Sequence, residues 1–177
     1  MIGFLRCVGV LNAGLWFGAA FFFSFSIGPA VFSSEMKELL QNYFPSYSGL
    51  IAQILIARYF KLQLICAIIA LGHLLGENLY FGRAPQKLWF GLLATLFALS
   101  LLGGFWLQPK LKSLHTAKYS AKESVERRQA AAESFKTWHA VSQIVNLFMI
   151  AGLGVHLCSV AARGESARFL DAGKLRS

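Results

Sequence analysis

The chain has 177 residues, of which 56% are hydrophobic, and it carries a formal net charge of +9. Its mean hydropathy of +0.54 and its 16 phenylalanines exclude an ordinary soluble domain and indicate an integral membrane protein. The positive charge lies in short segments between apolar stretches without a basic helix or an aromatic RNA-binding motif, so the lipid bilayer is the expected partner and nucleic acid is not.

Four apolar segments are long enough to cross a bilayer, which takes about 20 helical residues. They comprise residues 4–32, 59–80, 88–107 and 137–160. The first contains a charge-free run from residue 7 to residue 34, which is too long for the apolar region of a signal peptide, about 7–15 residues. It is therefore predicted to be a retained span, in which Pro29 marks a kink or the exit. Gly14 and Gly18 form a GxxxG motif, either a helix-packing face or a chance feature of a glycine-rich span.

Charges complicate the start of the second span, because Arg58 and Lys61 interrupt a long apolar run. We expect an interfacial helix over residues 35–57, broken near Pro45, followed by a span from Tyr59 to Tyr80. This arrangement places both cations at the level of the headgroups. The alternative is a single helix that runs through, with Arg58 at depth.

The third span is charge-free and has a tryptophan near each end, Trp89 and Trp106, separated by about 25 Å along a helix, as an interfacial aromatic belt requires. Mixed charges and helix formers over residues 110–134 predict a solvated helix or helical hairpin before the fourth span. Residues 163–177 form a short polar tail, which we expect to be mobile.

Membrane orientation follows from the lysines and arginines on each side. Ten lie with the first and third connections and seven on the opposite side. This difference predicts a cytoplasmic 110–134 segment and both termini outside.

The fourth span carries His139, Ser142 and Asn146 at helical positions i, i+3 and i+7. Polar groups that face lipid would be unpaired, so this stripe is expected to look into the bundle, with Tyr59 and Trp106 as neighbours. It could serve as interhelical hydrogen bonding, as a site for a solute or ion, or, through His139, as a metal or haem ligand.

A second polar set lies at the opposite membrane face once the spans are laid antiparallel. His73 and Glu77 stand at i and i+4, a spacing that suits joint metal ligation, and thiolate with imidazole would favour copper or zinc. Polar residues near helix ends also occur simply because they meet water. We therefore expect no metal and no cofactor, and keep as weak metal candidates Cys7, His73, Glu77, His156 and Cys158.

Catalytic signatures are missing from the sequence. It has no HExxH, GxSxG or P-loop motif and no carboxylate pair inside the spans. We therefore predict that the chain is not an enzyme, and a proton-driven pump is disfavoured because it would place Asp or Glu at depth. Cys7, Cys66 and Cys158 show no CxxC pairing and are expected to be buried small hydrophobes.

Several short motifs occur in order along the spans: "WFG" and "GPAVF" in the first, "ARYFKLQLIC" in the second, "WLQPK" in the third and "FKTWHAVSQIVN" in the fourth. Together they resemble the transmembrane protein 205-like family, also known as a bacterial domain of unknown function. The resemblance implies a four-helix integral membrane protein and no established biochemistry. Its motif positions fall on Tyr59–Phe60, on Trp106, Leu107 and Pro109, and on Trp138, His139, Ser142 and Asn146. Arg58 and Ala57 depart from the pattern.

The expected protein is thus all-α: residues 1–162 form a four-helix bundle of the bacterial inner membrane, and residues 163–177 the tail. Its expected function is non-enzymatic, that of a structural or accessory membrane component, with self-association or other membrane proteins as partners. The alternatives are a transporter or channel for a small solute or soft metal ion, and an electron-transfer subunit with haem between His73 and His156.

Overall fold

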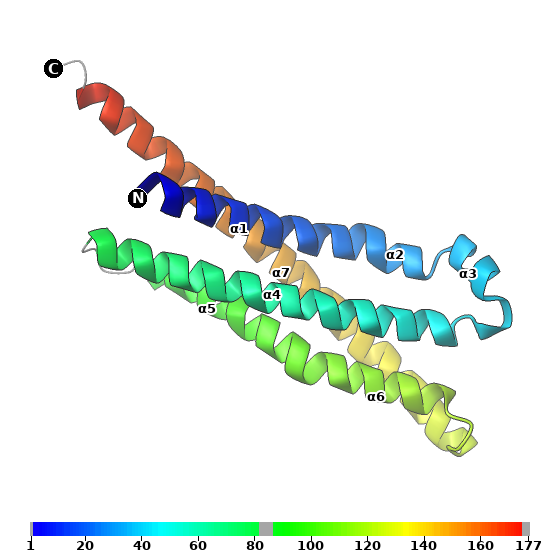
Figure 1. Ribbon diagram of the computed structural model, residues 1–177. Helices are drawn as coiled ribbons and strands as arrows, with labels where there is room; N and C mark the ends of the chain where they lie inside the picture. Colours follow the sequence, from blue (N-terminus) through cyan, green and yellow to red (C-terminus); the bar gives the residue numbers. More distant parts are fainter. Residues whose placement is uncertain (1, 82–86, 175–177) are drawn as a thin grey trace.

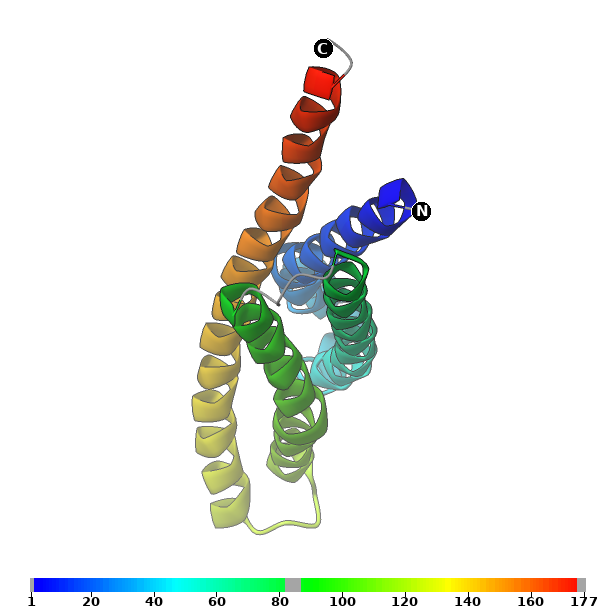
Figure 2. The same cartoon turned by 90° about the vertical axis from the view of Figure 1, so that its left-hand side faces the viewer.

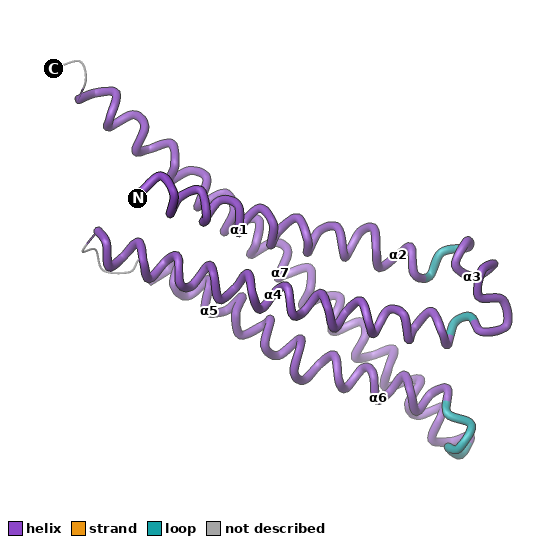
Figure 3. The backbone as a smooth tube through the Cα atoms, in the orientation of Figure 1, coloured by secondary structure: helices purple, strands orange, loops and turns teal. Residues whose placement is uncertain are grey.

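The computed structural model describes residues 2–81 and 87–174, and the regular structure of these residues is helical throughout (Figure 3). Four helical segments are long and apolar enough to cross a membrane, namely Gly3–Val31, Ser46–Tyr80, Lys87–Tyr119 and Val125–Ala162. Only 17–28% of the residues in their most apolar windows are buried. Most residues in these windows are therefore at least partly exposed, as expected where lipid is the solvent. The prediction of an all-α bundle with four potential membrane spans is confirmed.

The first span is one rod with a widened turn near its end. It comprises α1 (Ile2–Phe22), the π-helix η1 (Phe23–Ile27) and α2 (Gly28–Val31). The amide of Gly28 bonds to the carbonyl of Phe23, five residues back. Pro29 follows directly, and because proline has no N–H and its ring would crowd the preceding turn, the wider π-turn accommodates it without ending the helix.

The third span repeats this construction. It comprises α5 (Lys87–Leu102), the π-helix η3 (Gly103–Leu107) and α6 (Gln108–Tyr119), and the amide of Gln108 bonds to the carbonyl of Gly103. Pro109 takes the place that Pro29 has in the first rod. The rod therefore continues beyond the predicted end at residue 107.

The second span differs from the prediction at its start. A short helix does follow the first span, α3 (Ser34–Leu40), and the 3₁₀ turn η2 (Gln41–Tyr43) leads to α4 (Ser46–Phe81). The predicted break between residues 57 and 59 is wrong, because α4 runs through Arg58 and Lys61 without interruption. A helix of 36 residues is about 54 Å long, far more than the roughly 30 Å of hydrocarbon, so its first turns can lie outside the bilayer while the helix stays continuous.

The segment before the fourth span is a helical hairpin, as one of the two predicted forms. It consists of α6, a turn over residues 120–124 and the start of α7 (Val125–Lys174). Ser124 caps α7 by accepting from the amide of Arg127 at 3.3 Å. The backbone of the predicted tail continues α7 as far as Lys174. Residues 175–177 and the connection 82–86 lie outside the described residues.

Neighbouring rods run antiparallel, with α1 beside α4 and α6 beside α7, while α7 crosses the others at an angle (Figures 1 and 2). The start of α1 and the end of α7 lie at one end of the bundle, and α3 and the α6–α7 turn lie at the other (Figure 1). The core forms where all four rods meet and includes Trp16, Tyr59, Cys66, Leu96 and Leu153.

All three cysteines are free, but they differ in exposure. Cys66 is buried, as predicted, whereas Cys7 and Cys158 are exposed. The prediction of burial is wrong for these two because they lie on outward faces of α1 and α7, which in a membrane protein are apolar without being internal.

Candidate functional site

A three-helix junction joins the rods near the π-helix of the first span. The hydroxyl of Tyr59 on α4 donates to Oδ1 of Asn146 on α7 at 3.2 Å. Nδ2 of Asn146 donates to the hydroxyl of Ser24 on η1 at 2.7 Å, and Ser24 donates to the carbonyl of Ala20 at 2.7 Å. These hydrogen bonds connect α4 to α1 through α7 and η1 without a gap.

Aromatic stacking fixes the tyrosine in this junction. The ring of Phe23 lies 4.4 Å from that of Tyr59 at an interplanar angle of 12°, and Phe60 packs at 5.5 Å. Tyr59 is only 8% exposed. A buried phenol needs a hydrogen-bond acceptor, which Asn146 supplies. The π-turn matters here because Phe23 and Ser24 both belong to it.

A second polar layer joins α1 and α4 nearer the chain ends. The indole N–H of Trp16 donates to the side-chain oxygen of Gln63, and Nδ2 of Asn12 donates to the carbonyl of Cys66 at 2.9 Å. Trp16 and Gln63 are fully buried. Nε2 of Gln63 has no hydrogen-bond partner among the described residues, which makes this amide the least satisfied polar group at the centre of the bundle.

The predicted stripe is not one unit in the structure. Asn146 and Tyr59 meet directly, as described, but Ser142 donates only to the carbonyl of His139 in its own helix at 2.7 Å. The side chain of His139 is exposed and stacks on Phe135 at 5.7 Å. The expectation that His139 faces the bundle is therefore wrong.

Neighbouring contacts give the reason for the position of His139. At this level α7 meets α6 and η3 rather than α1, and it does so through Trp138, whose ring lies 5.2 Å from that of Trp106. The next residue is turned about 100° around the helix, which carries His139 away from the contact. Lys110 lies over both indoles, 3.7 Å from Trp138 and 5.1 Å from Trp106, so Trp106 belongs to an aromatic and cationic contact separate from Asn146.

The predicted metal candidates do not converge. Nε2 of His73 lies 3.9 Å from Glu77, yet the same atom is 2.8 Å from the carbonyl of Leu5. His156 packs against Trp16 at 6.2 Å, and Cys7 and Cys158 are exposed. Among the described residues, no group of three or more His, Cys, Asp or Glu side chains is placed to hold a metal ion.

The GxxxG glycines face outward. A Cβ atom added at Gly14 or Gly18 would meet nothing within 4 Å, so neither glycine serves packing inside this bundle. Close helix approach occurs instead at Gly103, where a Cβ would lie 2.1 Å from the ring of Phe60, and at Gly49, where it would lie 2.0 Å from the ring of His115.

Sequence reasoning missed Ser24, Trp16 and Gln63. Gln63 is a polar residue inside an apolar helical run and could have been singled out as His139 was. Ser24 gave no comparable signal, because a serine can satisfy its hydroxyl within its own helix, and only the π-turn aims it at Asn146.

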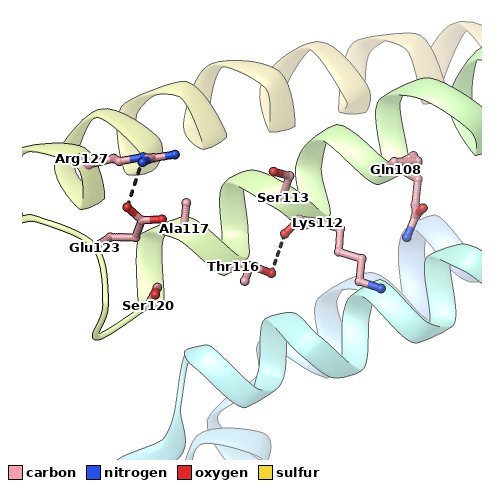
Figure 4. A pocket seen from close by; sticks show the side chains of 9 residues that line it. Gln108, Lys112, Ser113, Thr116, Ala117, Ser120, Glu123 and Arg127 are labelled. Atoms are coloured by element: carbon pink, nitrogen blue, oxygen red, sulfur yellow. Dashed lines mark hydrogen bonds and ion pairs between the residues drawn. The ribbon is translucent and has the colours of Figure 1, made fainter.

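A polar groove of about 550 Å³ lies beside α6, beyond the aromatic contact (Figure 4). Its walls come from α6, the turn after it and the first residues of α7. It is lined by Gln108, Pro109, Lys112, Ser113, Thr116, Ala117, Ser120, Glu123 and Arg127. At its far end, Nε of Arg127 pairs with Glu123 at 3.2 Å.

Comparison with known proteins gives a family and no activity. No curated protein and no solved structure matches the chain. The model of a family described as a domain of unknown function, DUF4149, matches residues 11–120, which include most of the first span, the second and third spans, both π-turns, Ser24 and Tyr59, but not Asn146. Because this match covers more than half of the sequence, the chain belongs to the DUF4149 family.

Proposed function

We propose that this protein is a non-enzymatic, structural or accessory component of a membrane. The observation that carries the proposal is the junction of Ser24, Tyr59 and Asn146, in which the polar groups bond to one another across three helices. In lipid such bonds hold helices together, and side chains used in this way are not free to act on a substrate. The lipid bilayer is its first partner, and self-association or other membrane proteins would complete its role.

The kind of membrane and the orientation of the protein in it are part of the same proposal. The sequence motifs shared with the transmembrane protein 205-like family support a bacterial inner-membrane location. The excess of lysine and arginine near the α6–α7 hairpin supports a cytoplasmic position for that hairpin, with both chain ends outside.

One observation favours a second candidate, a transporter or channel for a small solute. Nε2 of Gln63 is buried without a partner among the described residues, beside Trp16 and near the middle of α4. A polar solute that accepts a hydrogen bond would satisfy it, and discontinuous or widened helices near a central polar group are common in transporters.

The two candidates are separated by complementing a deletion strain that is screened against metals and toxic compounds. The complementing genes encode the wild type, Gln63→Met, Asn146→Ala and, as a control outside the bundle, His139→Ala. A structural role predicts that Gln63→Met rescues whenever its membrane abundance equals that of the wild type. Failure of Gln63→Met at equal abundance would instead support transport, and native electrophoresis in mild detergent would report any lost assembly.

A further inference from the structure

The groove beside α6 offers many hydrogen-bond donors and one carboxylate. Lys112 is exposed, and neither its ammonium nor the hydroxyl of Ser113 has a partner among the described residues. The hydroxyl of Ser120 accepts from the amide of Lys122 at 3.3 Å, so its own O–H stays available. Arg127 engages Glu123 through Nε and retains its terminal N–H groups. Such a set of donors suits an anion.

The ends of the groove differ in character (Figure 4). The Arg127–Glu123 ion pair lies at one end, with Ser120 close by, and its single carboxylate is already neutralised by the arginine. Gln108 and Lys112 lie at the other end, where Nε2 of Gln108 contacts Gln53 of α4 at 3.5 Å. The uncompensated cation of the groove is therefore Lys112.

The end with Lys112 lies at the membrane boundary. Trp106, Trp138 and Lys110 form the aromatic and cationic contact described above, and such groups sit at headgroup depth. Lys112 is six residues past Trp106, or about 9 Å along the helix axis. The headgroup layer is roughly 5–8 Å thick on each side of the hydrocarbon, so the backbone of Lys112 lies near the outer edge of that layer. The turns just before the groove expose Leu102 and Phe105, which offer an apolar surface to an acyl chain.

The surrounding charge also favours an anion. Residues 108–136 carry seven lysines and arginines against three glutamates. We propose that this groove is a binding site for the headgroup of an anionic phospholipid, with Lys112 and Ser113 on the phosphate and the hydroxyls of Thr116 and Ser120 beside the polar remainder of the headgroup. A lipid fits better than a soluble phosphate because Lys112, the one cation lining the groove that has no ion-pair partner among the described residues, lies at the membrane end of the groove.

The test is a titration of the full-length protein, in zwitterionic detergent, with short-chain phosphatidylglycerol and, in parallel, with phosphatidylcholine of the same chain length. Tighter binding of phosphatidylglycerol is expected. Lys112→Gln should weaken that binding about five-fold, the effect of one interfacial lysine, and Lys112→Arg should restore it. Ser113→Ala provides a second variant on the phosphate that does not alter charge.

Lys136→Gln is the matched control, because it removes the same charge from the same hairpin at an exposed position outside the groove. It should change the dissociation constant less than two-fold. An equal loss in Lys112→Gln and Lys136→Gln would mean diffuse charge attraction and overturn the site. Competition by millimolar inorganic phosphate would overturn the lipid assignment, and equal binding of phosphatidylcholine would overturn both. Unchanged thermal unfolding of each variant confirms that binding alone was altered.

Discussion

Asn146 is the residue on which the polar contacts of the bundle depend most. It accepts from Tyr59 and donates to Ser24, so Asn146→Ala removes both bonds and leaves a buried phenol unpaired. We expect the free energy of unfolding to fall by about 1–2 kcal/mol, since interhelical hydrogen bonds in membranes contribute roughly 0.6 each and an unpaired buried group adds its own cost. Unfolding in mixed micelles measures this change.

Ser142→Ala is the control for that prediction, because Ser142 bonds only within its own helix. Its effect should stay within about 0.5 kcal/mol. In a double-mutant cycle, Tyr59→Phe should cost little more once Asn146 is already alanine. Equal destabilisation by Asn146→Ala and Ser142→Ala would contradict the assignment of the junction.

Residue spacing alone could predict Asn146 but not His139. A stripe at i, i+3 and i+7 is correct for a helix that keeps one neighbour along its length. α7 changes neighbours, from η1 and α4 at Asn146 to η3 and α6 near Trp138, and the face that is internal at one level is external two turns earlier. Crossing angles of this kind are set by packing between helices and are absent from any single-helix pattern.

At the scale of elements, the close approach of η3 to α4 depends on Gly103. A methyl group there would lie 2.1 Å from the ring of Phe60, so Gly103→Ala must displace that ring from its place against Tyr59. We expect a loss of about 1–3 kcal/mol, the usual cost of overpacking, measured by thermal unfolding in detergent.

Gly14→Ala is the matched glycine substitution, since a methyl group at Gly14 meets nothing within 4 Å. It should leave the unfolding midpoint unchanged or raise it slightly, because alanine favours the helix. Rescue of Gly103→Ala by Phe60→Leu would locate the clash, whereas equal effects of the two glycine substitutions would refute it.

Helix α3 offers a test outside the four candidate spans. Ser33 accepts from the amide of Met36 at 3.3 Å, and hydrogen bonds, first of all with the side chain of Ser33, lower the pKa of Glu35 below its ordinary value of 4.5. A carboxyl group with a lowered pKa stabilises the folded form above its unfolded pKa and loses that effect as the pH falls through the folded pKa. Ser33→Ala should therefore raise the pKa of Glu35 and weaken α3, by about 1 kcal/mol for the cap. Hydrogen exchange of the α3 amides, followed between pH 6 and pH 3, measures both effects.

The elements themselves were largely predictable from the sequence, and the exceptions have two causes. Hydropathy located the four spans, and charge indicated the hairpin before the last. The break expected near Arg58 assumed that charges end a membrane helix, whereas α4 continues through Arg58 and Lys61. The π-turns were not predicted: Pro29 indicated a kink or an exit and the third span was expected to end at residue 107, because a proline carries the same signal whether a helix stops, bends or widens.

At the scale of the molecule, the two hairpins share a plan. Pro29 and Pro109 are 80 residues apart, each follows a π-helix of five residues, and both rods run in the same direction (Figure 1). The same spacing relates buried Ala13, Trp16 and Ala20 to buried Leu93, Leu96 and Ser100. The rods therefore present equivalent faces to the core, and α4 and α7 return beside them. The polar junctions break this likeness, since Ser24 corresponds to Gly104 and Tyr59 to the exposed His139.

This plan makes a definite prediction of topology, because the start of α1 and the end of α7 lie at one end of the bundle and α3 lies with the α6–α7 turn at the other (Figure 1). Single cysteines at Gly3, Ser34 and Lys122 test it on a background of Cys7→Ser, Cys66→Ala and Cys158→Ser. A membrane-impermeant maleimide applied to intact cells should label Gly3→Cys alone if the hairpin is cytoplasmic, and it should label the other two only after the membrane is opened. The reverse pattern would invert the proposed orientation and keep the four crossings, whereas labelling Gly3→Cys and Ser34→Cys from the same side would show that α1 does not cross the bilayer.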